Sequence, residues 1–373
     1  MPPRAEAPEP PGTRSGGGRL LSLDALRGFD MFWITGGALL FARLAETTGR
    51  QPFVWIAHQT EHVEWHGFRF WDLIFPLFLF LAGVSTPLSF ERRLASGATR
   101  GELARHTVRR GLTLVALGVV YNGLLRFDWD TLRYASVLGR IGLAWMFAAL
   151  AALYLRPRGQ ALLCGGVLLG YWAALSWIPV PGFGAGDLAP GHTLTDWVDR
   201  TLLPGRLHRE VRDPEGILGT VPAIATALLG MFAGRFVTSE RPAARRVAGL
   251  LAAGGIALAV GWLWGRVFPL NKNLWTSSFV LWTGGLSLVA LALTHLVVDV
   301  WGARRLAFPF VVIGRNAILI YMLEAFVAFD LVADLVFAKG LGRMHAGLAP
   351  LGGLLLRWLL LYALYRRRWY LRV

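Results

Sequence analysis

Apolar residues in this chain form long runs separated by short polar segments. A helix that crosses a bilayer needs about 20 mostly apolar residues, and about ten runs reach or approach that length. The pattern therefore predicts an all-α, polytopic membrane protein. The predicted spans are residues 21–44, 70–91, 107–125, 136–155, 160–178, 216–236, 244–265, 275–298, 307–330 and 348–365.

Composition strengthens this prediction. Hydrophobic residues make up 55% of the chain, charged residues only 16%, and the mean hydropathy is +0.48. Soluble domains average about 25% charged residues, so a soluble protein is excluded. Residues 1–18 are rich in Pro, Gly and Ala without apolar periodicity, which predicts a disordered tail before a single membrane domain over 19–373.

The formal net charge is +15, and nearly all of the basic residues are Arg. A basic chain can indicate nucleic-acid binding, but these Arg residues gather in every second short loop, as the positive-inside rule expects. We therefore predict a lipid bilayer as the partner, no nucleic acid, and both termini in the cytoplasm. The basic segments include residues 92–110, 156–158, 241–246, 304–305 and 366–368.

The alternate loops are expected outside the cytoplasm, and two of them are long, at about 45–69 and 179–215. In the first, His58, His62 and His66 recur at every fourth residue and would line one face of a helix. This pattern suits an interfacial helix, a metal site or a general base. The base is favoured over the metal, because a neutral imidazole with a pKa of about 6.5 accepts protons near neutral pH.

Two carboxylates lie near predicted helix starts. Asp24 and Arg27 are one turn apart in SLDALRG, where they form either an ion pair beside the helix dipole or a clamp for an anionic cofactor. Asp72 lies in FWDLIFP, where it either caps its helix or orients a histidine, as a carboxylate does in a catalytic triad. Pro76 removes a backbone donor and favours a kink beside the site.

Polar residues also interrupt the apolar runs. Asn122, Thr220 and Asn316 suit either interhelical hydrogen bonds or a water-filled site. Arg140, in SVLGRIG, is the strongest candidate, because an arginine within a membrane helix needs a counter-anion such as Asp, Glu or phosphate. The single cysteine, Cys164, is read as a small packing residue.

Six segments together resemble the heparan-α-glucosaminide N-acetyltransferase family and its bacterial relatives, which belong to a transmembrane acyltransferase superfamily. The resemblance covers about Arg19 to the C-terminus. In chain order the segments are RLLSLDALRGFDMFWI, EHVEWHGFRFWDLIFPLFLFLAGVS, SVLGRIGLAW, DPEGILGTVPAIATALLG, NKNLWTSSFVLWTGG and FVVIGRNAILIYMLEAF.

This resemblance implies transfer of an acetyl group from cytosolic acetyl-CoA to the amine of a glucosamine across the membrane. It also implies a bacterial cytoplasmic-membrane location and a possible homodimer. The family's essential histidine precedes a W-x-G-x(4)-D-L-x-F-P pattern, which selects His62, three residues before Trp65. A human member is expected to carry an asparagine in the first helix, where this chain has about Thr35.

The implied mechanism uses His62 as general base, helped by Asp72, or as a nucleophile that becomes acetylated. Candidate oxyanion donors are Thr35, Asn122 and Asn316, and further candidate substrate contacts are His66 and Glu215. The rival functions are an O-acyltransferase of a cell-envelope polysaccharide and a proton-coupled transporter. CoA phosphates are expected among basic side chains, with no metal, and the candidate residues are Asp24, Arg27, Arg109, Arg110 and Arg140.

Overall fold

The computed structural model describes residues 20–344 and 346–371, and the side chains of 337–345 are outside this description. The predicted disordered tail, residues 1–18, lies outside the described residues. Within them every regular element is a helix, and β-pairing is confined to two isolated bridges. The all-α prediction is confirmed.

Seven helices of the described chain are long and apolar enough to cross a membrane, or up to eight if one bent pair counts as a span. The protein is therefore an integral, multi-pass membrane protein, whereas the predicted number of ten spans is not reached by this test. The seven are α4 (Trp71–Ala95), α6 (Val137–Tyr154), α7 (Pro157–Trp177), α9 (Ile217–Val237), α10 (Ala243–Trp264), α11 (Ser277–Thr294) with η3 (His295–Val300), and α15 (Pro350–Arg366) with η4 (Ala346–Leu348).

The first predicted span, 21–44, is broken. It consists of α1 (Leu21–Phe32), the π-helical turn η1 (Trp33–Gly37) and α2 (Ala38–Thr48). Helical geometry is lost at Thr35 and Gly36, where Gly36 has a φ of 124°. Glycine adopts this left-handed region without a steric penalty, so an apolar run that reads as continuous changes direction here.

The third predicted span, 107–125, begins earlier than expected, as α5 (Arg100–Tyr121). Thr99 and Glu102 form a capping box: the Thr99 side chain accepts from the Glu102 amide, and the Glu102 side chain accepts from the Thr99 amide. This cap starts the helix within the Arg-rich segment, two turns before the apolar run.

The predicted span 307–330 is also divided. The pair α12 (Arg304–Gly314) and α13 (Ala317–Leu323) is bent by 52°, and α14 (Phe329–Met344) is separate. Asn316 lies at the bend, where its side chain donates to the Trp369 carbonyl and accepts from the Leu371 amide. The shorter elements are α3 (Gln51–Gln59), η2 (Leu124–Arg126) and α8 (Leu194–Leu202), the last within the long loop predicted at about 179–215.

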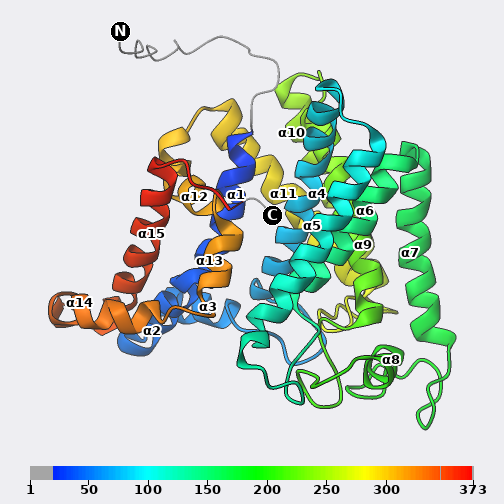
Figure 1. Ribbon diagram of the computed structural model, residues 1–373, viewed down its shortest axis with the longest axis horizontal. Helices are drawn as coiled ribbons and strands as arrows, with labels where there is room; N and C mark the ends of the chain where they lie inside the picture. The colour runs from blue at the N-terminus through cyan, green and yellow to red at the C-terminus, as the bar shows by residue number, and fades with distance from the viewer. Residues whose placement is uncertain (1–19, 345, 372–373) are drawn as a thin grey trace.

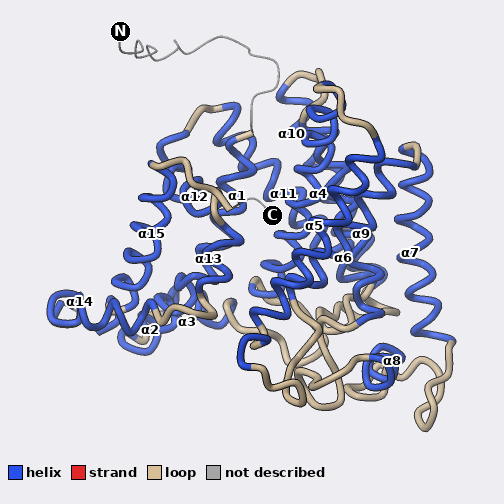
Figure 2. The backbone as a smooth tube through the Cα atoms, in the orientation of Figure 1, coloured by secondary structure: helices blue, strands red, loops and turns tan. Residues whose placement is uncertain are grey.

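The helices form two groups (Figure 1). One group contains α4, α5, α6, α9, α10 and α11, with α7 at its edge. The other contains α1, α12, α13 and α15, and α2, α3 and α14 lie across one end of it (Figure 2). Buried side chains of α4, α6 and α9 contribute most of the largest core cluster, and residues of α5, α7 and α11 also belong to it.

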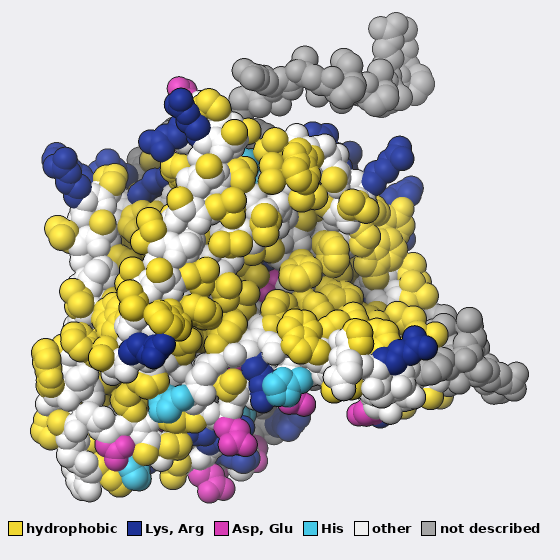
Figure 3. Space-filling model, turned by 180° about the vertical axis from the view of Figure 1, so that it is seen from behind, with side chains coloured by type: hydrophobic (Ala, Val, Ile, Leu, Met, Phe, Trp, Pro, Cys, Tyr) yellow, Lys and Arg dark blue, Asp and Glu magenta, His cyan; other side chains and the backbone are white. Residues whose placement is uncertain are grey.

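The two ends of the molecule differ in chemistry (Figure 3). We call the end with connections 96–99, 155–156, 238–242 and 301–303 the basic end, because Arg side chains flank these connections. We call the opposite end, with loops 60–70, 122–136, 178–216 and 265–276, the loop end. His, Asp and Glu side chains gather there.

The crossing of α4 and α9 depends on glycine. A Cβ on Gly83 would lie 2.2 Å from the Ala227 carbonyl oxygen, and one on Gly230 would lie 2.1 Å from the Phe80 carbonyl oxygen. Both obstacles are backbone atoms, which cannot move aside without separating the helices. Small residues allow such close approach between membrane helices.

Gly83→Leu is therefore expected to destabilise the fold by about 1–3 kcal/mol or more. The measurement is the unfolding temperature and the monodisperse yield in detergent. Gly255→Leu, in α10, is the matched control, because an added Cβ there meets nothing within 4 Å. Equal stability of the two variants would contradict backbone contact at this crossing.

Candidate active site

The site is centred on His62, in the loop between α3 and α4. Its Nδ1 lies 2.8 Å from Oδ1 of Asp72, which is in the first turn of α4. The second carboxylate oxygen, Oδ2, accepts from the Arg69 amide at 3.1 Å. Asp72 therefore contacts both the backbone before its helix and a histidine, although α4 has no side-chain cap.

The three histidines do not share a helix face, so that expectation is wrong. Helix α3 ends at Gln59, and only His58 lies on it. His62 and His66 lie in the irregular loop, which turns back where the Gln59 side chain accepts from the Phe70 amide. In the described chain no group of three or more His, Cys, Asp or Glu side chains is placed to hold a metal ion.

The partner of His62 determines its tautomer. An ionised carboxylate can only accept a hydrogen bond, so Nδ1–H donates to Asp72 and Nε2 keeps its lone pair. The Asp72 side chain is 1% exposed, whereas that of His62 is 52% exposed. A buried carboxylate thus holds a solvent-accessible imidazole with Nε2 free to take a proton, as in a base with its orienting acid.

Lys272 is the site residue that our sequence analysis did not single out. It lies in the loop before α11, and its Nζ is 3.1 Å from Nδ1 and 3.3 Å from Nε2 of His62. The same Nζ is 3.7 Å from Oδ1 of Asp72. Burial lowers the pKa of Lys272, and the charge of Asp72 opposes that shift. The available signal was that Lys272 is one of two lysines in an Arg-rich chain.

The loop that carries Lys272 is held by its neighbours. The Asn271 side-chain oxygen accepts from the Leu274 amide at 2.9 Å, and the Asn271 amide donates to the Thr276 hydroxyl at 3.1 Å. The Asn271 side chain also lies 3.3 Å from Nδ1 of His66, whose pKa is lowered by burial. His66 therefore joins the two loops rather than facing the Asp72 carboxylate.

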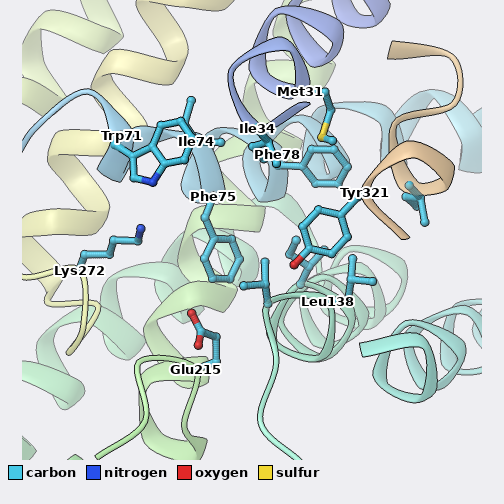
Figure 4. Close-up of a pocket in the computed structure, with 13 residues that line it drawn as sticks. Met31, Ile34, Trp71, Ile74, Phe75, Phe78, Leu138, Glu215, Lys272 and Tyr321 are labelled. Atoms are coloured by element: carbon cyan, nitrogen blue, oxygen red, sulfur yellow. The ribbon is translucent and has the colours of Figure 1, made fainter. Parts of the chain in front are cut away.

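A cavity of about 190 Å³ begins beside this group. Figure 4 shows the Lys272 ammonium and the Glu215 carboxylate directed toward Phe75, with the Tyr321 hydroxyl pointing in from another wall. His62 lies at the edge, because it contacts Lys272 and its ring centroid is 6.2 Å from that of Trp71. The remaining lining is Met31, Ile34, Ile74, Phe78, Val137, Leu138, Ile141 and Ile318.

A charged network supports the Glu215 side of the cavity. Arg133 donates to both Asp213 oxygens, with Nε at 2.7 Å from Oδ2, and also to the Glu215 carboxylate. Burial raises the pKa of Asp213, but its bonds from Arg133 outweigh this and lower the pKa. Arg140 is 2% exposed and donates to the Gly216 carbonyl at 3.2 Å.

The candidate cofactor residues fall in three places. Arg27 contacts Asp24 at 3.5 Å and donates to the Ser85 hydroxyl. Arg110 packs over the Trp145 ring, close enough to Arg27 for the two positive charges to interact. Arg109 instead lies on the outward face of α5. The structure thus brings Asp24, Arg27 and Arg110 together, and separates them from Arg109 and from Arg140, which is near the loop end.

The three candidate oxyanion donors already donate hydrogen bonds to backbone carbonyls. The Thr35 hydroxyl donates to the Met31 carbonyl at 2.9 Å, within the break of the first span. The Asn122 side chain donates to the carbonyls of Arg133 and Ala135, at 3.0 and 2.7 Å. The Asn316 side chain donates to Trp369, as described above. Each of the three ties loops or helix breaks together.

Comparison with known proteins shows which family the chain matches. A profile of the heparan-alpha-glucosaminide N-acetyltransferase catalytic region matches residues 19–266. The chain belongs to this family. The matched range contains His62, Asp72, Arg140 and Glu215, and it ends before Lys272.

Two relatives in this family are similar over most of the chain. The mouse heparan-alpha-glucosaminide N-acetyltransferase is 28% identical in an alignment 321 residues long, and the match covers 70% of this chain and 48% of the mouse protein. The human protein of the same name is 29% identical over 320 residues, with the same shares of each chain. The alignments thus span about half the length of these relatives.

Proposed function

We propose that the protein is a membrane acetyltransferase that moves an acetyl group from cytosolic acetyl-CoA to the amine of an amino sugar on the other side of the membrane. The observation that carries this proposal is the pairing of His62 with buried Asp72, 2.8 Å apart, at the edge of an apolar cavity. Family membership supports the reaction type, and the positive-inside rule supports a cytoplasmic basic end.

His62 is proposed to act as a general base. An amine that is protonated at neutral pH has no lone pair with which to attack a thioester, so a base has to remove a proton at or before attack. The Nε2 atom suits this role, because Asp72 occupies Nδ1 and the ring is half exposed at the loop end. Glu215 is the proposed acceptor contact, since its carboxylate faces the same cavity.

The donor is proposed to enter from the basic end. The CoA phosphates would meet Arg27 and Arg110, and the pantetheine arm would extend toward the cavity, whose walls are mostly apolar. Arginine suits this role because its guanidinium donates to phosphate oxygens in pairs. Only the acetyl group then has to reach His62, so no separate transport step for CoA is required.

Arg110→Ala is accordingly expected to raise the KM for acetyl-CoA about tenfold, which corresponds to the loss of about 1.4 kcal/mol of binding. The measurement is initial rate against acetyl-CoA concentration. Arg109→Ala is the matched control, because it removes the neighbouring charge from the outward face of the same helix. An equal rise in KM for the control would show that the effect comes from general surface charge.

The deciding experiment is acetyl transfer by the purified protein in detergent, from labelled acetyl-CoA to glucosamine. Label in the N-acetyl product, with one CoA released for each acetyl transferred, is the expected result. Label found only on hydroxyl acceptors would replace the proposal with O-acyl transfer. Absence of both transfer and acetyl-CoA binding would favour a transporter.

A further inference from the structure

We propose that Lys272 is a catalytic residue whose ammonium binds the carbonyl oxygen of the acetyl thioester as that oxygen becomes negative during transfer. This inference rests on the proposed acetyl transfer, and it assigns the electrostatic part of the reaction, which the pairing of His62 with Asp72 does not supply. Stabilisation of the developing oxyanion is often the largest single contribution to acyl-transfer catalysis.

The position of Lys272 leaves the base free to act. Its Nζ is almost equidistant from the two ring nitrogens of His62, at 3.1 and 3.3 Å. Because Cε1 lies between those nitrogens, an atom at these distances lies over the ring face and not along either lone pair. The Nε2 lone pair therefore remains available for the amine proton.

In the same position Lys272 has N–H groups available to donate to a substrate. An ammonium carries three N–H groups, and the nearest carboxylate oxygen, on Asp72, is 3.7 Å away, beyond a normal hydrogen bond. Figure 4 shows the side chain extended toward the cavity, where it is 16% exposed. A thioester carbonyl in this cavity would thus meet an N–H of Lys272 beside the base.

Among the described residues that line the cavity, Lys272 is the only cation. Glu215 would repel an oxyanion, and the Tyr321 hydroxyl, whose ring stacks on Tyr121, carries no charge. Thr35, Asn122 and Asn316 already donate to backbone carbonyls. Lys272 is therefore the charged donor best placed for this role.

Two carboxylates oppose the effect of burial, which lowers the pKa of Lys272. Burial and the Arg140 guanidinium favour the neutral amine, whereas Asp72 on α4 and Glu215 before α9 favour the ammonium. His62 is the remaining titratable group in contact with Nζ. Asp72 and Glu215 thus favour the charged form of this side chain, which is the form that donates to an oxyanion.

The step balances as a simple acyl transfer. The amine nitrogen bonds to the thioester carbon, and the carbonyl π electrons move to oxygen, which accepts a hydrogen bond from Lys272. His62 Nε2 takes the proton that the nitrogen loses. The oxyanion then re-forms C=O and breaks the C–S bond, and the imidazolium returns the proton to the CoA thiolate. Lys272 is unchanged at the end, and the products are the amide and CoA.

The test compares Lys272→Met and Lys272→Arg with the wild type. Lys272→Met is expected to lower kcat for acetyl transfer about 10²–10³-fold, as loss of one oxyanion donor does elsewhere. The KM for acetyl-CoA is expected to change less than about threefold, because the interaction strengthens only in the transition state. Lys272→Arg, which keeps a charged donor, is expected to recover at least about tenfold of the lost rate.

Arg266→Met is the matched control, since it removes an exposed cation from the same loop, where Arg266 packs over Trp262. Unfolding temperatures accompany each assay, and if the Met variant does not fold, Lys272→Gln replaces it. If the wild type transfers acetyl and the uncharged variant keeps the same kcat, the role proposed for Lys272 is wrong, whereas the proposed function stands. Absence of transfer by the wild type would instead overturn the proposed function.

Discussion

His62→Ala is expected to lower kcat for acetyl transfer by about 10²–10⁴-fold, the range that a general base contributes. The variant removes the nitrogen that accepts the amine proton and leaves Asp72 and Lys272 without their shared partner. His62 is half exposed, so the fold has little packing to lose and the unfolding temperature is expected to stay within a few degrees. The measurement is the initial rate of acetyl-glucosamine formation at saturating substrates.

His66→Ala is the matched control. It lies in the same loop, but its Nδ1 contacts Asn271 and not the Asp72 carboxylate. This variant is expected to keep kcat within about tenfold of the wild type, because it removes no proton acceptor from the proposed reaction. A larger loss in His66→Ala than in His62→Ala would move the base to His66 and contradict our assignment.

The wild type and His62→Ala also distinguish the two possible mechanisms, in which His62 is either a base or a nucleophile. If His62 only takes a proton, acetyl-CoA without acceptor yields no acetylated protein. If His62 attacks the thioester, the wild type shows a burst of CoA release and a mass gain of one acetyl group, and His62→Ala shows neither. Our proposal expects the first result. A stable acetyl group that disappears in the variant would replace the base with a nucleophile.

Asp72→Asn is expected to lower kcat about 10²-fold or more, with a smaller change in KM. The amide keeps the shape of the side chain and an oxygen that can accept from the Arg69 amide, so the start of α4 is retained. The amide removes the charge that orients Nδ1–H, and an NH₂ group facing Nδ1 forces the proton to Nε2. The ring then has no lone pair for the amine, as in a triad whose acid is replaced by its amide.

Asp187→Asn is the control for this prediction. Asp187 also contacts a histidine, with Oδ2 at 2.7 Å from Nδ1 of His192, but neither residue lines the cavity. The control is expected to keep both kcat and KM. The role assigned to Asp72 would be wrong if Asp72→Asn kept kcat, or if both variants lost activity equally.

Some features of the site could be predicted from sequence because they depend on short chain distances. His62 and Asp72 are 10 residues apart, on either side of a turn into an apolar helix, so their types and spacing indicated a possible pair. Lys272 is 210 residues from His62, and no local pattern connects them. The two loops meet only because α4 and α11 pack in the same bundle.

Other features were predicted wrongly because hydropathy indicates which segments are buried but not where a helix changes direction. The runs 21–44 and 307–330 are mostly apolar, so each was predicted to be one span. The breaks at Thr35–Gly36 and Asn316 come from backbone geometry and from hydrogen bonds to distant carbonyls. Residues adjacent in sequence also have different surroundings: Arg109 and Arg110 are neighbours, but consecutive residues of a helix point to different sides.

The sequence by itself determined that the chain is an all-helical membrane protein, because the lack of backbone hydrogen-bond partners in lipid makes each long apolar run a helix. It also indicated the family through six ordered segments. The tertiary structure decided which polar side chains meet. Membrane helices pack through close backbone contact, as at Gly83 and Gly230, and this packing places Lys272 and Glu215 beside the pair of His62 and Asp72 at one cavity.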